Sequence, residues 1–513
     1  MAREDSARIA TFNLGDLSAA RLDDVGPDGA GRDPAARAAA AIVQRVRPDV
    51  LVLNEIDYDH DAVDPLTGVR RFAGRYLARG AGPIDYPHAF AAVSNTGISS
   101  GFDLDRGGDA VRGAGERGTR EYGNDAFGYG TYPGQYAMAL LSKLPIDRDA
   151  VRTFQHFLWR DLPGNHLPED YYGPEASAAL RLSSKSHWDV PLLLDGRRLH
   201  LWVSHPTPPA FDGPEDRNGR RNFDEIGFWR LYLEGSDALY DDQGGRGSYA
   251  SDEPFVIAGD LNSDPTDPPS YEGVTAIDQL LDHPRIQDPA GRLTSRGATE
   301  HLRAAIAAAK AAGDEETAAD LERRAHPERA TADWLGGRRV DYLLPSAGLA
   351  VVGGGVFWPA LEEDAEGYAL AEAASDHRLV WLDVRVREAG RRLRWGRGRR
   401  SRPIRGARAG PVLDLPSAAP SAPPARPHRL VRSRTPPFQG GNTGSNPVGD
   451  TIPSPPPFGG SKSLKSKQVS EAPNPFAGSK AIPRGKTRCW NLRWRSGSRP
   501  RQDSSARVTR FSA

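Results

Sequence analysis

Short apolar runs that stop at an acid, an amide or a histidine recur along the first three quarters of the chain. A run of this length between polar residues is typical of a buried β-strand, and residues at strand ends share a common rim. Six runs have this form: Ile9-Ala-Thr-Phe-Asn13, Leu51-Val-Leu-Asn-Glu55, Leu201-Trp-Val-Ser-His205, Val256-Ile-Ala-Gly-Asp260-Leu-Asn262, Arg339-Val-Asp341-Tyr-Leu-Leu and Ser375-Asp376-His377-Arg-Leu-Val. They predict one rim where carboxylates, amides and two histidines meet.

The segments between these runs predict helices that alternate with strands. Pro34–Val46 is rich in alanine, Pro34 suits a first helical turn and Pro48 ends the helix, so a β-α-β unit opens the chain. Further elements are strands at Trp188–Leu194 and His200–Ser204, a helix opening at Asn222 with capping-box character and running through Leu231 and Tyr240, and a surface helix at 300–330 interrupted near Gly313. This alternation predicts an α/β fold, a four-layer α/β/β/α sandwich of two packed mixed sheets.

Charge is divided unevenly along the chain. Residues 1–390 hold 41 Lys and Arg against 63 Asp and Glu, a net charge of −22, whereas residues 391–513 hold 26 against 4, a net charge of +22. Duplex nucleic acid is bound mainly by Lys and Arg that neutralise its phosphates. The acidic part therefore favours a small or loosely held phosphoester, although a local basic patch would still allow a nuclease.

The composition predicts one catalytic domain over residues 1–388 and a disordered tail over residues 389–513. The tail is rich in Arg, Pro, Ser and Gly without sustained periodicity, so it cannot bury enough surface to offset its chain entropy. Within it, Gly441-Asn-Thr-Gly-Ser-Asn-Pro447 matches the translation of a tRNA-gene T-arm. We hypothesise that the tail is a translation artefact; a full-length intact mass from the native source would contradict this.

Cysteine content and the N-terminus bear on compartment. Cys489 is the only cysteine, so residues 1–388 have neither a disulfide nor a thiol nucleophile. The chain begins without an apolar signal segment, and no stretch approaches the roughly 18 apolar residues of a membrane span. These features predict a cytoplasmic protein without a membrane partner, unless a misassigned start hides an export signal. They leave the oligomeric state open.

The polar residues at the predicted rim suit metal-assisted hydrolysis. Carboxylate and amide oxygens are ligands for a hard cation such as Mg²⁺ or Mn²⁺, and histidines can transfer protons. Alone, Glu55 could be a surface ion-pair partner, Asn13 a turn residue and His205 a structural histidine. Asp260 and Asn262 are two residues apart, so an extended segment would direct both side chains to one face. Six such motifs in one chain favour a metal-dependent hydrolase.

The residues of these motifs and their order along the chain resemble those of the endonuclease/exonuclease/phosphatase superfamily, which has the deoxyribonuclease I-like fold. Gly259-Asp260-Leu261-Asn262 and Ser375-Asp376-His377 are its most specific signatures here, and the resemblance covers roughly residues 7 to 386. Long insertions, including Trp188-Asp-Val-Pro and His205-Pro-Thr-Pro-Pro, are similar to those of a bacterial subgroup. The resemblance implies the same four-layer sandwich.

The resemblance also implies a role for each residue. Glu55 and Asp376 would hold one divalent ion, while His377, oriented by Asp341, would activate water. Asp260 would position that water, and Asn13, Asn262 and His205 would bind the phosphate, with His205 alternatively a general acid. Many members carry Asn two residues before this histidine, where this chain has Val203.

Three other features are weaker. Asp103-Leu-Asp105-Arg-Gly-Gly-Asp109 is similar to the start of a calcium loop but lacks the closing glutamate, so a structural Ca²⁺ site is a minor expectation. Arg217, Arg220 and Arg221 could form a phosphate-binding rim or a solvated cluster at a helix start. Gln135 and Tyr136 could line the cleft, although core packing is the simpler role for Tyr136.

The sequence therefore predicts a divalent-metal-dependent phosphoesterase that hydrolyses a phosphomonoester or phosphodiester by activated water. One alternative is a nuclease acting on DNA or RNA. Another is a non-catalytic nucleic-acid-binding protein that uses the basic tail. The presence of all eight site residues argues against the inactive alternative.

Overall fold

Two packed β-sheets form the centre of the computed structural model, which describes residues 6–108 and 113–386. The first sheet has the order β10-β11-β1-β2-β4-β3 and the second β5-β6-β7-β8-β9. Only the pairs β1/β2 and β7/β8 are parallel among the described strands. The strands are β1 (Ser6–Leu17), β2 (Val50–Ile56), β3 (His88–Phe90), β4 (Met138–Ser142), β5 (Arg152–Thr153), β6 (His187–Leu194), β7 (Arg197–Ser204), β8 (Phe255–Asp260), β9 (Asp341–Pro345), β10 (Leu349–Val356) and β11 (Val380–Val386).

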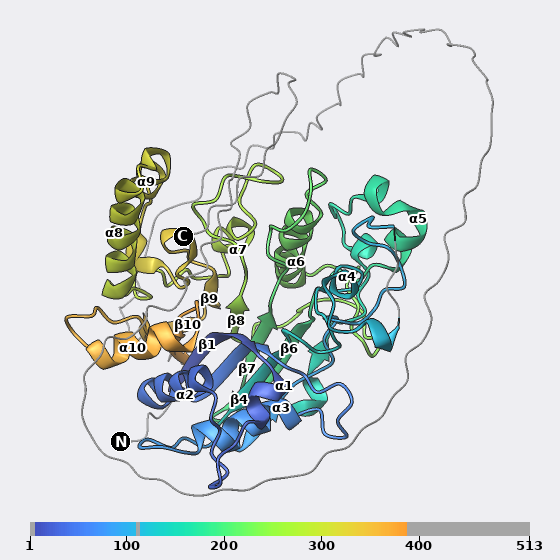
Figure 1. Cartoon of the computed structure of the whole chain (residues 1–513). Helices are drawn as coiled ribbons and strands as arrows, with labels where there is room; N and C mark the ends of the chain where they lie inside the picture. The colour runs from blue at the N-terminus through green and yellow to red at the C-terminus, as the bar shows by residue number, and fades with distance from the viewer. Residues whose placement is uncertain (1–5, 109–112, 387–513) are drawn as a thin grey trace, which may run out of the picture. The chain divides into compact units, whose positions relative to one another are not determined.

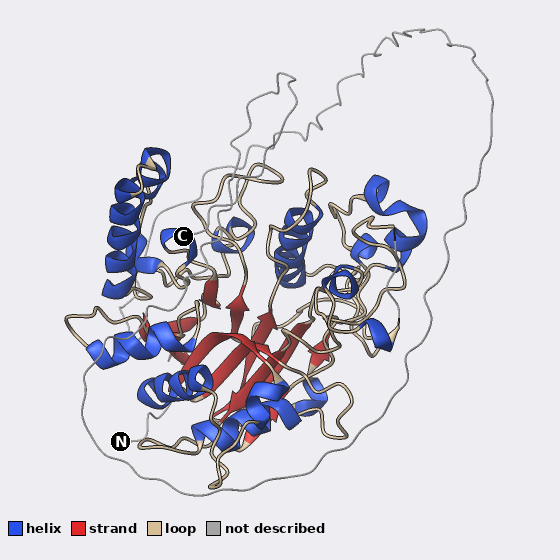
Figure 2. Ribbon diagram, in the orientation of Figure 1, coloured by secondary structure: helices blue, strands red, loops and turns tan. Residues whose placement is uncertain are grey.

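Helices cover the outer faces of both sheets. Figure 2 shows the strands in the middle, with α2 and α3 on one side and α6 and α7 on the other. The α-helices are α1 (Ala19–Asp23), α2 (Pro34–Val46), α3 (Thr67–Phe72), α4 (Arg120–Asn124), α5 (Glu169–Ala179), α6 (Arg217–Glu234), α7 (Asp278–Leu281), α8 (Arg296–Ala311), α9 (Glu315–Glu322) and α10 (Ala365–Ala374). Single turns are η1 (Ala73–Leu77), η2 (Ala114–Glu116), η3 (Arg148–Ala150), η4 (Trp159–Asp161), η5 (Pro327–Arg329) and η6 (Trp334–Gly336). The predicted α/β sandwich is confirmed.

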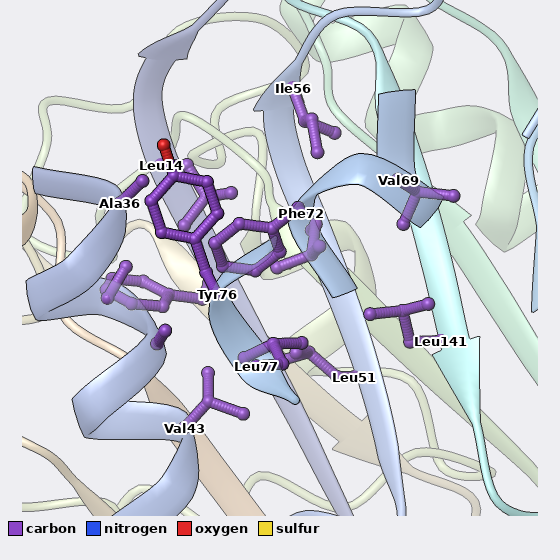
Figure 3. Packing of buried hydrophobic residues seen from close by; sticks show 14 of the residues in the cluster. Leu14, Ala36, Val43, Leu51, Ile56, Val69, Phe72, Tyr76, Leu77 and Leu141 are labelled. Atoms are coloured by element: carbon purple, nitrogen blue, oxygen red, sulfur yellow. The ribbon is translucent and has the colours of Figure 1, made fainter. Parts of the chain in front are cut away.

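The α2 helix has the bounds that its sequence predicts. The side chain of Asp33 caps the helix by accepting a hydrogen bond from the backbone N–H of Ala36, and Pro34 occupies the first turn. Arg47 ends the helix in a left-handed conformation. Figure 3 shows Ala36 and Val43 of α2 directed toward Phe72 and its neighbours, so this helix seals the outer face of the first sheet.

Two further apolar clusters complete the core. Between the sheets lie small aliphatic side chains, among them Val52 of β2 and Val203 of β7. The outer face of the second sheet is aromatic instead: Trp202 stacks on Phe255 with ring centroids 4.1 Å apart and on Trp229 at 5.4 Å. Val203, two residues before His205, belongs to this inter-sheet core and is fully buried.

The helix predicted to open at Asn222 begins earlier, and that expectation is wrong. α6 starts at Arg217, and Asn222 lies inside it, where its amide donates to the carbonyls of Thr207 and Leu261. The helix ends before Gly235, whose φ of 90° terminates it short of Tyr240. By contrast, the interruption predicted near Gly313 is present, because the chain turns there between α8 and α9 with a φ of 72°.

Strand direction explains why the polar run ends meet. β1 and β2 are parallel, as are β7 and β8, so their carboxyl ends lie at one edge; β9 and β11 are antiparallel to them and begin at that edge. The two sheets are joined there by a hydrogen bond from the backbone N–H of Asp260 to Asn54 Oδ1. Asp109 and residues 387–513, including the predicted tail, lie outside the described residues. No helix in the described part of the chain is long and apolar enough to cross a bilayer.

Candidate active site

Asn13 links the two carboxylates at the centre of the rim. Its Nδ2 donates to Glu55 Oε1 and to Asp260 Oδ2, both at 3.0 Å, and so joins the two sheets. The second oxygen of Glu55 accepts from the backbone N–H of Asp16 at 3.0 Å. Glu55 itself has a φ of 58°, a strained conformation for a residue with a side chain. Several contacts therefore fix its carboxylate at the end of β2.

Asp260, His205, His377 and Asp341 form a second group beside this pair. His205 Nε2 lies 3.4 Å and His377 Nε2 3.7 Å from Asp260 Oδ2, while His377 Nδ1 lies 2.9 Å from Asp341 Oδ2. The backbone N–H of Asp341 donates to Thr331 Oγ1 at 3.0 Å. His377 thus lies between two carboxylates, one on each side of its ring.

Burial and neighbouring charges shift the pKa values of these groups in different directions. Burial raises the pKa of Asp260 to about 7, against the opposing charge of His377, and burial also raises the pKa of Glu55. Burial alone would lower the pKa of His377, but the charges of Asp341 and Asp260 raise it well above its usual value. Burial lowers the pKa of His205 well below its usual value, and the cations Lys185 and His377 add to that. The two histidines therefore differ in character, His205 neutral and His377 strongly basic.

The carboxylates at this rim fit a hard divalent cation. Glu55, His205 and Asp260 each offer a ligand atom, and these atoms lie within 4.8 Å of one another. Asp376, predicted to share the ion with Glu55, is exposed and lies outside this group. Its Oδ1 accepts from Ser375 Oγ at 3.3 Å, and its charge contributes to raising the pKa of Glu55 after burial. The cluster of potential ligands thus includes Asp260 beside Glu55, and the role of Asp376 as a metal ligand stays a prediction.

Asn262 reaches the site by a turn rather than along an extended strand. β8 ends at Asp260, and Asn262 has a left-handed φ of 51°, so the expectation of two side chains leaving one face of a strand is wrong. Its backbone N–H donates to Asp260 Oδ1 at 2.9 Å, and its Nδ2 donates to the carbonyl of Pro206 at 3.1 Å. Asn262 thus ties Asp260 to the segment that follows His205.

The arginines of α6 are occupied by the protein's own groups. Arg221 is buried and donates to the carbonyls of Leu182, Phe127 and Arg181. Arg220 donates to the carbonyls of Glu215 and His166. These contacts fasten the insertions around the rim and engage Nε and Nη2 of Arg221, so the phosphate-binding role of Arg220 and Arg221 stays a prediction.

The predicted calcium loop has a partner that its sequence did not indicate. Asp103 and Asp105 converge with Asp125, a buried residue further along the chain, with ligand atoms within 4.8 Å of one another. Asp103 already accepts hydrogen bonds from the backbone N–H groups of Gly107 and Gly108. The Ca²⁺ site stays a prediction, since Asp109 lies outside the described residues.

Gln135 and Tyr136 lie beside the Glu55 side of the site. Gln135 Nε2 is 3.4 Å from the carboxylate of Asp16. Tyr136 is half-buried, has a φ of 56°, and its ring stacks on Tyr129 with centroids 6.3 Å apart. Burial, then the charges of Asp16 and Glu55, raises the pKa of Tyr136, which places its hydroxyl near those acids.

Lys185 is a site residue that the sequence reasoning missed. It is 6% exposed, and within the described residues its ammonium has no hydrogen bond or ion pair of 4.0 Å or less. Burial lowers its pKa, while the charges of Glu225, Glu55 and Asp260 oppose that change, so the ammonium lies close to the site acids. A signal was available: Ser183-Ser-Lys-Ser directly precedes β6, and antiparallel pairing of β6 with β7 puts the start of β6 next to His205.

Glu225 on α6 fixes the two loops that carry Lys185 and His205. One carboxylate oxygen accepts from the backbone N–H and the hydroxyl of Ser184, and the other accepts from the backbone N–H of Thr207 at 2.7 Å. The side chain is 1% exposed. A buried carboxylate thus joins the segment after His205 to the segment before Lys185.

Sequence comparison agrees with this geometry. The model of the Endonuclease/Exonuclease/phosphatase family matches residues 10–377, a span that includes every residue of the site. The chain belongs to this family. Members of the family are hydrolases of phosphoesters, so this chain is a member of a phosphoesterase family. Among curated proteins, none matches the sequence.

Several solved structures are similar to this chain at low sequence identity. An endonuclease/exonuclease/phosphatase from Beutenbergia cavernae DSM 12333 is 19% identical, with 75% of this chain and 72% of that chain covered and a TM-score of 0.40. The human Nocturnin catalytic domain with bound sulfate is 13% identical, with 74% and 94% covered and a TM-score of 0.36. Sphingomyelinase C from Streptomyces griseocarneus is 15% identical, with 74% and 99% covered and a TM-score of 0.35.

Proposed function

We propose that this family member hydrolyses a small phosphomonoester or phosphodiester with the help of Mg²⁺ or Mn²⁺. The observation that carries the proposal is His377, held between Asp341 and Asp260 next to the carboxylate pair Glu55 and Asp260. This arrangement supports the proposal because it would bring a base, a water-orienting acid and acidic ligands for a cation together at one rim, a combination suited to hydrolysis of a phosphoester.

In the proposed mechanism, the neutral form of His377 removes the proton from a water that attacks phosphorus in line. Because Asp341 and Asp260 raise the pKa of His377, this form gains population as the pH rises. Asp341 fixes the ring tautomer through Nδ1 and leaves Nε2 to face Asp260 and the water. The new bond joins the water oxygen to phosphorus, the bond from phosphorus to the leaving oxygen breaks, and the leaving alkoxide takes a proton from solvent to give the alcohol. Asp260 orients the water, since its carboxylate lies within reach of both histidines.

The phosphate would be bound by neutral and cationic donors. His205 is neutral and suited to donate a hydrogen bond to a phosphate oxygen rather than to act as a general acid, while Lys185 supplies an unpaired ammonium. Asn13 and Asn262 hold the surrounding carboxylates in place. A divalent ion held by Glu55, together with Asp260 or Asp376, would neutralise a non-bridging oxygen and assist the leaving group.

Charge supports a small substrate over a long polyanion. Residues 1–390 carry a net charge of −22. Of the arginines considered for a phosphate rim, Arg220 and Arg221 donate to backbone carbonyls, and Arg217 pairs with Glu215. A nuclease would have to bind its substrate against this field. The nuclease and the non-catalytic, tail-dependent binding protein remain the alternatives that the experiment must distinguish.

The test compares the full-length wild type with His377→Ala on three substrates: bis-p-nitrophenyl phosphate, p-nitrophenyl phosphate and plasmid DNA, each with Mg²⁺, Mn²⁺ or EDTA. We expect metal-dependent turnover of the small esters and a loss of about 10²- to 10⁴-fold in kcat for the variant, the usual contribution of an acid–base residue. His156→Ala is the matched control, since that histidine is exposed and pairs with Asp242, which is not a residue of the site.

Each outcome is informative. A strong preference for plasmid DNA would establish the nuclease instead. A folded wild type that turns over none of the three substrates with either metal, yet binds DNA, would support the non-catalytic alternative. Equal losses in His377→Ala and His156→Ala would contradict the assigned base.

A further inference from the structure

Trp334 contacts the proposed base but takes no part in the mechanism above. Its ring lies 6.1 Å from that of His377, centroid to centroid, at an interplanar angle of 67°. Trp159, Trp188, Trp202, Trp229 and Trp358 are fully buried, whereas Trp334 keeps part of its surface exposed. A partly exposed indole beside the proposed base is placed to contact a substrate bound there.

The segment that carries it is strained. Three consecutive residues have positive φ: Leu335 at 53°, Gly336 at 74° and Gly337 at 105°. Leu335 is not glycine, so its left-handed conformation costs free energy that contacts elsewhere must offset. We call residues 332–338 the Trp334 loop. Its ends are closed by reciprocal backbone hydrogen bonds between Ala332 and Arg338, and Ala332 also forms a bridge with His377.

The α8–α9 insertion holds this loop. Arg324, just beyond α9, donates to the carbonyls of Leu335 and Gly337, and His301 Nε2 of α8 lies 2.6 Å from the carbonyl oxygen of Asp333. Leu321 and Leu302 pack against Gly336. The α8–α9 insertion thus contacts the Trp334 loop at several points. These contacts hold its left-handed backbone in place.

A third set of contacts connects the Trp334 loop to the segment that carries His377. Arg378, which follows His377, donates to Asp333 Oδ2 at 3.0 Å, and the backbone N–H of Asp333 donates to the carbonyl of Asp376. The position of the indole relative to His377 is therefore fixed from both sides. The loop holds a partly exposed apolar ring at a defined place beside the reacting group.

We propose that Trp334 determines substrate specificity by packing against the ester group that stays on the phosphate, and that the α8–α9 insertion positions it. This rests on the proposed function. Because water enters from the side of His377, the leaving alcohol departs from the far side, and a substituent beside His377 belongs to the retained ester. An indole face suits a planar aromatic or other apolar group. The preferred substrate is thus a diester whose retained group is aromatic or apolar.

The test uses two diesters with the same leaving group, bis-p-nitrophenyl phosphate and methyl p-nitrophenyl phosphate. We expect the wild type to have a higher kcat/KM for bis-p-nitrophenyl phosphate. Trp334→Ala should reduce that preference by about tenfold, as expected for loss of one apolar contact, by raising the KM of bis-p-nitrophenyl phosphate. Trp334→Phe should keep most of the preference. Arg324→Met should reduce it as well, since the loop loses its clamp, and Trp381→Phe, a half-buried tryptophan on β11, should leave it unchanged.

A purely structural role gives a different result. If Trp334→Ala lowers kcat on both esters equally and Trp334→Phe does not restore the preference, the residue only positions His377 and the proposal is wrong. An unchanged preference in Trp334→Ala also overturns it.

A binding measurement separates this proposal from the catalytic one. Millimolar bis-p-nitrophenyl phosphate, whose second aryl group stays on the phosphate, should in EDTA quench the tryptophan fluorescence of the wild type more than that of Trp334→Phe. A wild type that hydrolyses neither ester but shows this difference would refute the proposed function and retain the contact. Equal quenching in the two proteins would refute the contact.

Discussion

Asp341 and Asp260 control the proton on His377 from opposite sides of its ring. Asp341 accepts from one ring nitrogen and its charge raises the pKa of the histidine, so replacing it by an amide removes both the charge and the orientation. We expect Asp341→Asn to lower kcat by about 10²- to 10⁴-fold. The acid limb of the pH–rate profile should also move to lower pH, because a histidine that loses a negative neighbour loses its proton more easily.

The measurement is kcat against pH on the best small ester. Asp147→Asn is the control, since Asp147 forms a surface ion pair with Arg198 away from the rim. If the acid limb of the Asp341→Asn profile does not move, a group other than His377 determines the pH dependence of kcat.

At the residue scale, the sequence identified which side chains meet but not how they are joined. Asn13 was expected beside a ligand, and the structure places its amide between two carboxylates. Asn262 depends on a left-handed turn that no local pattern indicates. Lys185 has no motif of its own, and only the pairing of β6 with β7 brings it to the site. Contacts that depend on strand pairing cannot be inferred from spacing along one segment.

Among the elements, α6 links the insertions to the site through Glu225. Its carboxylate satisfies buried backbone N–H groups of Ser184 and Thr207. We expect Glu225→Ala to lower the free energy of unfolding by about 2–4 kcal/mol, because two buried backbone N–H groups and the Ser184 hydroxyl lose their acceptor. Catalytic efficiency should fall as well, since the same contacts fix the loops of Lys185 and His205.

Chemical denaturation and steady-state kinetics check this prediction. Glu234→Ala is the matched control on the same helix, because that carboxylate is exposed and forms an i,i+4 ion pair with Arg230 that should contribute no more than about 0.5 kcal/mol. Similar losses in the two variants would show that the clamp at Glu225 has no special role.

The elements that could be predicted are those with strong local signals. α2 has a capping aspartate, a proline at its first turn and an apolar face, and its bounds match. α6 was misplaced by five residues because Asn222 has a typical capping side chain but uses it for a tertiary contact with Thr207. Local capping chemistry predicts a helix start only where tertiary contacts do not claim the same side chain.

Across the whole molecule, the motif order predicted the fold because each polar residue follows or precedes a buried strand. Parallel and antiparallel pairing then bring the ends of β1, β2, β7 and β8 and the starts of β9 and β11 to one edge. The insertions could not be predicted in this way. They support the site from outside through long-range contacts, as α8 and α9 do for Trp334.

His200 connects β7 to β6 and to the segment before β8. Its Nδ1 lies 2.7 Å from Asp189 Oδ1 and its Nε2 3.0 Å from Glu253 Oε2. Burial alone would lower the pKa of this histidine, but the hydrogen bonds and charges of the two acids raise it above its usual value. A raised pKa means that the folded state binds the proton more tightly than the unfolded state, in which the pKa of histidine is about 6.5.

The stabilisation from His200 should therefore be complete below about pH 6.5 and be lost as the pH rises through the higher folded-state pKa. We expect the gap in Tm between the wild type and His200→Gln to be wider at pH 6 than at pH 9. Thermal unfolding across that range measures it, with His156→Gln as the exposed-histidine control. A gap that stays constant with pH would mean that His200 stabilises the fold through packing and neutral hydrogen bonds, without a bound proton.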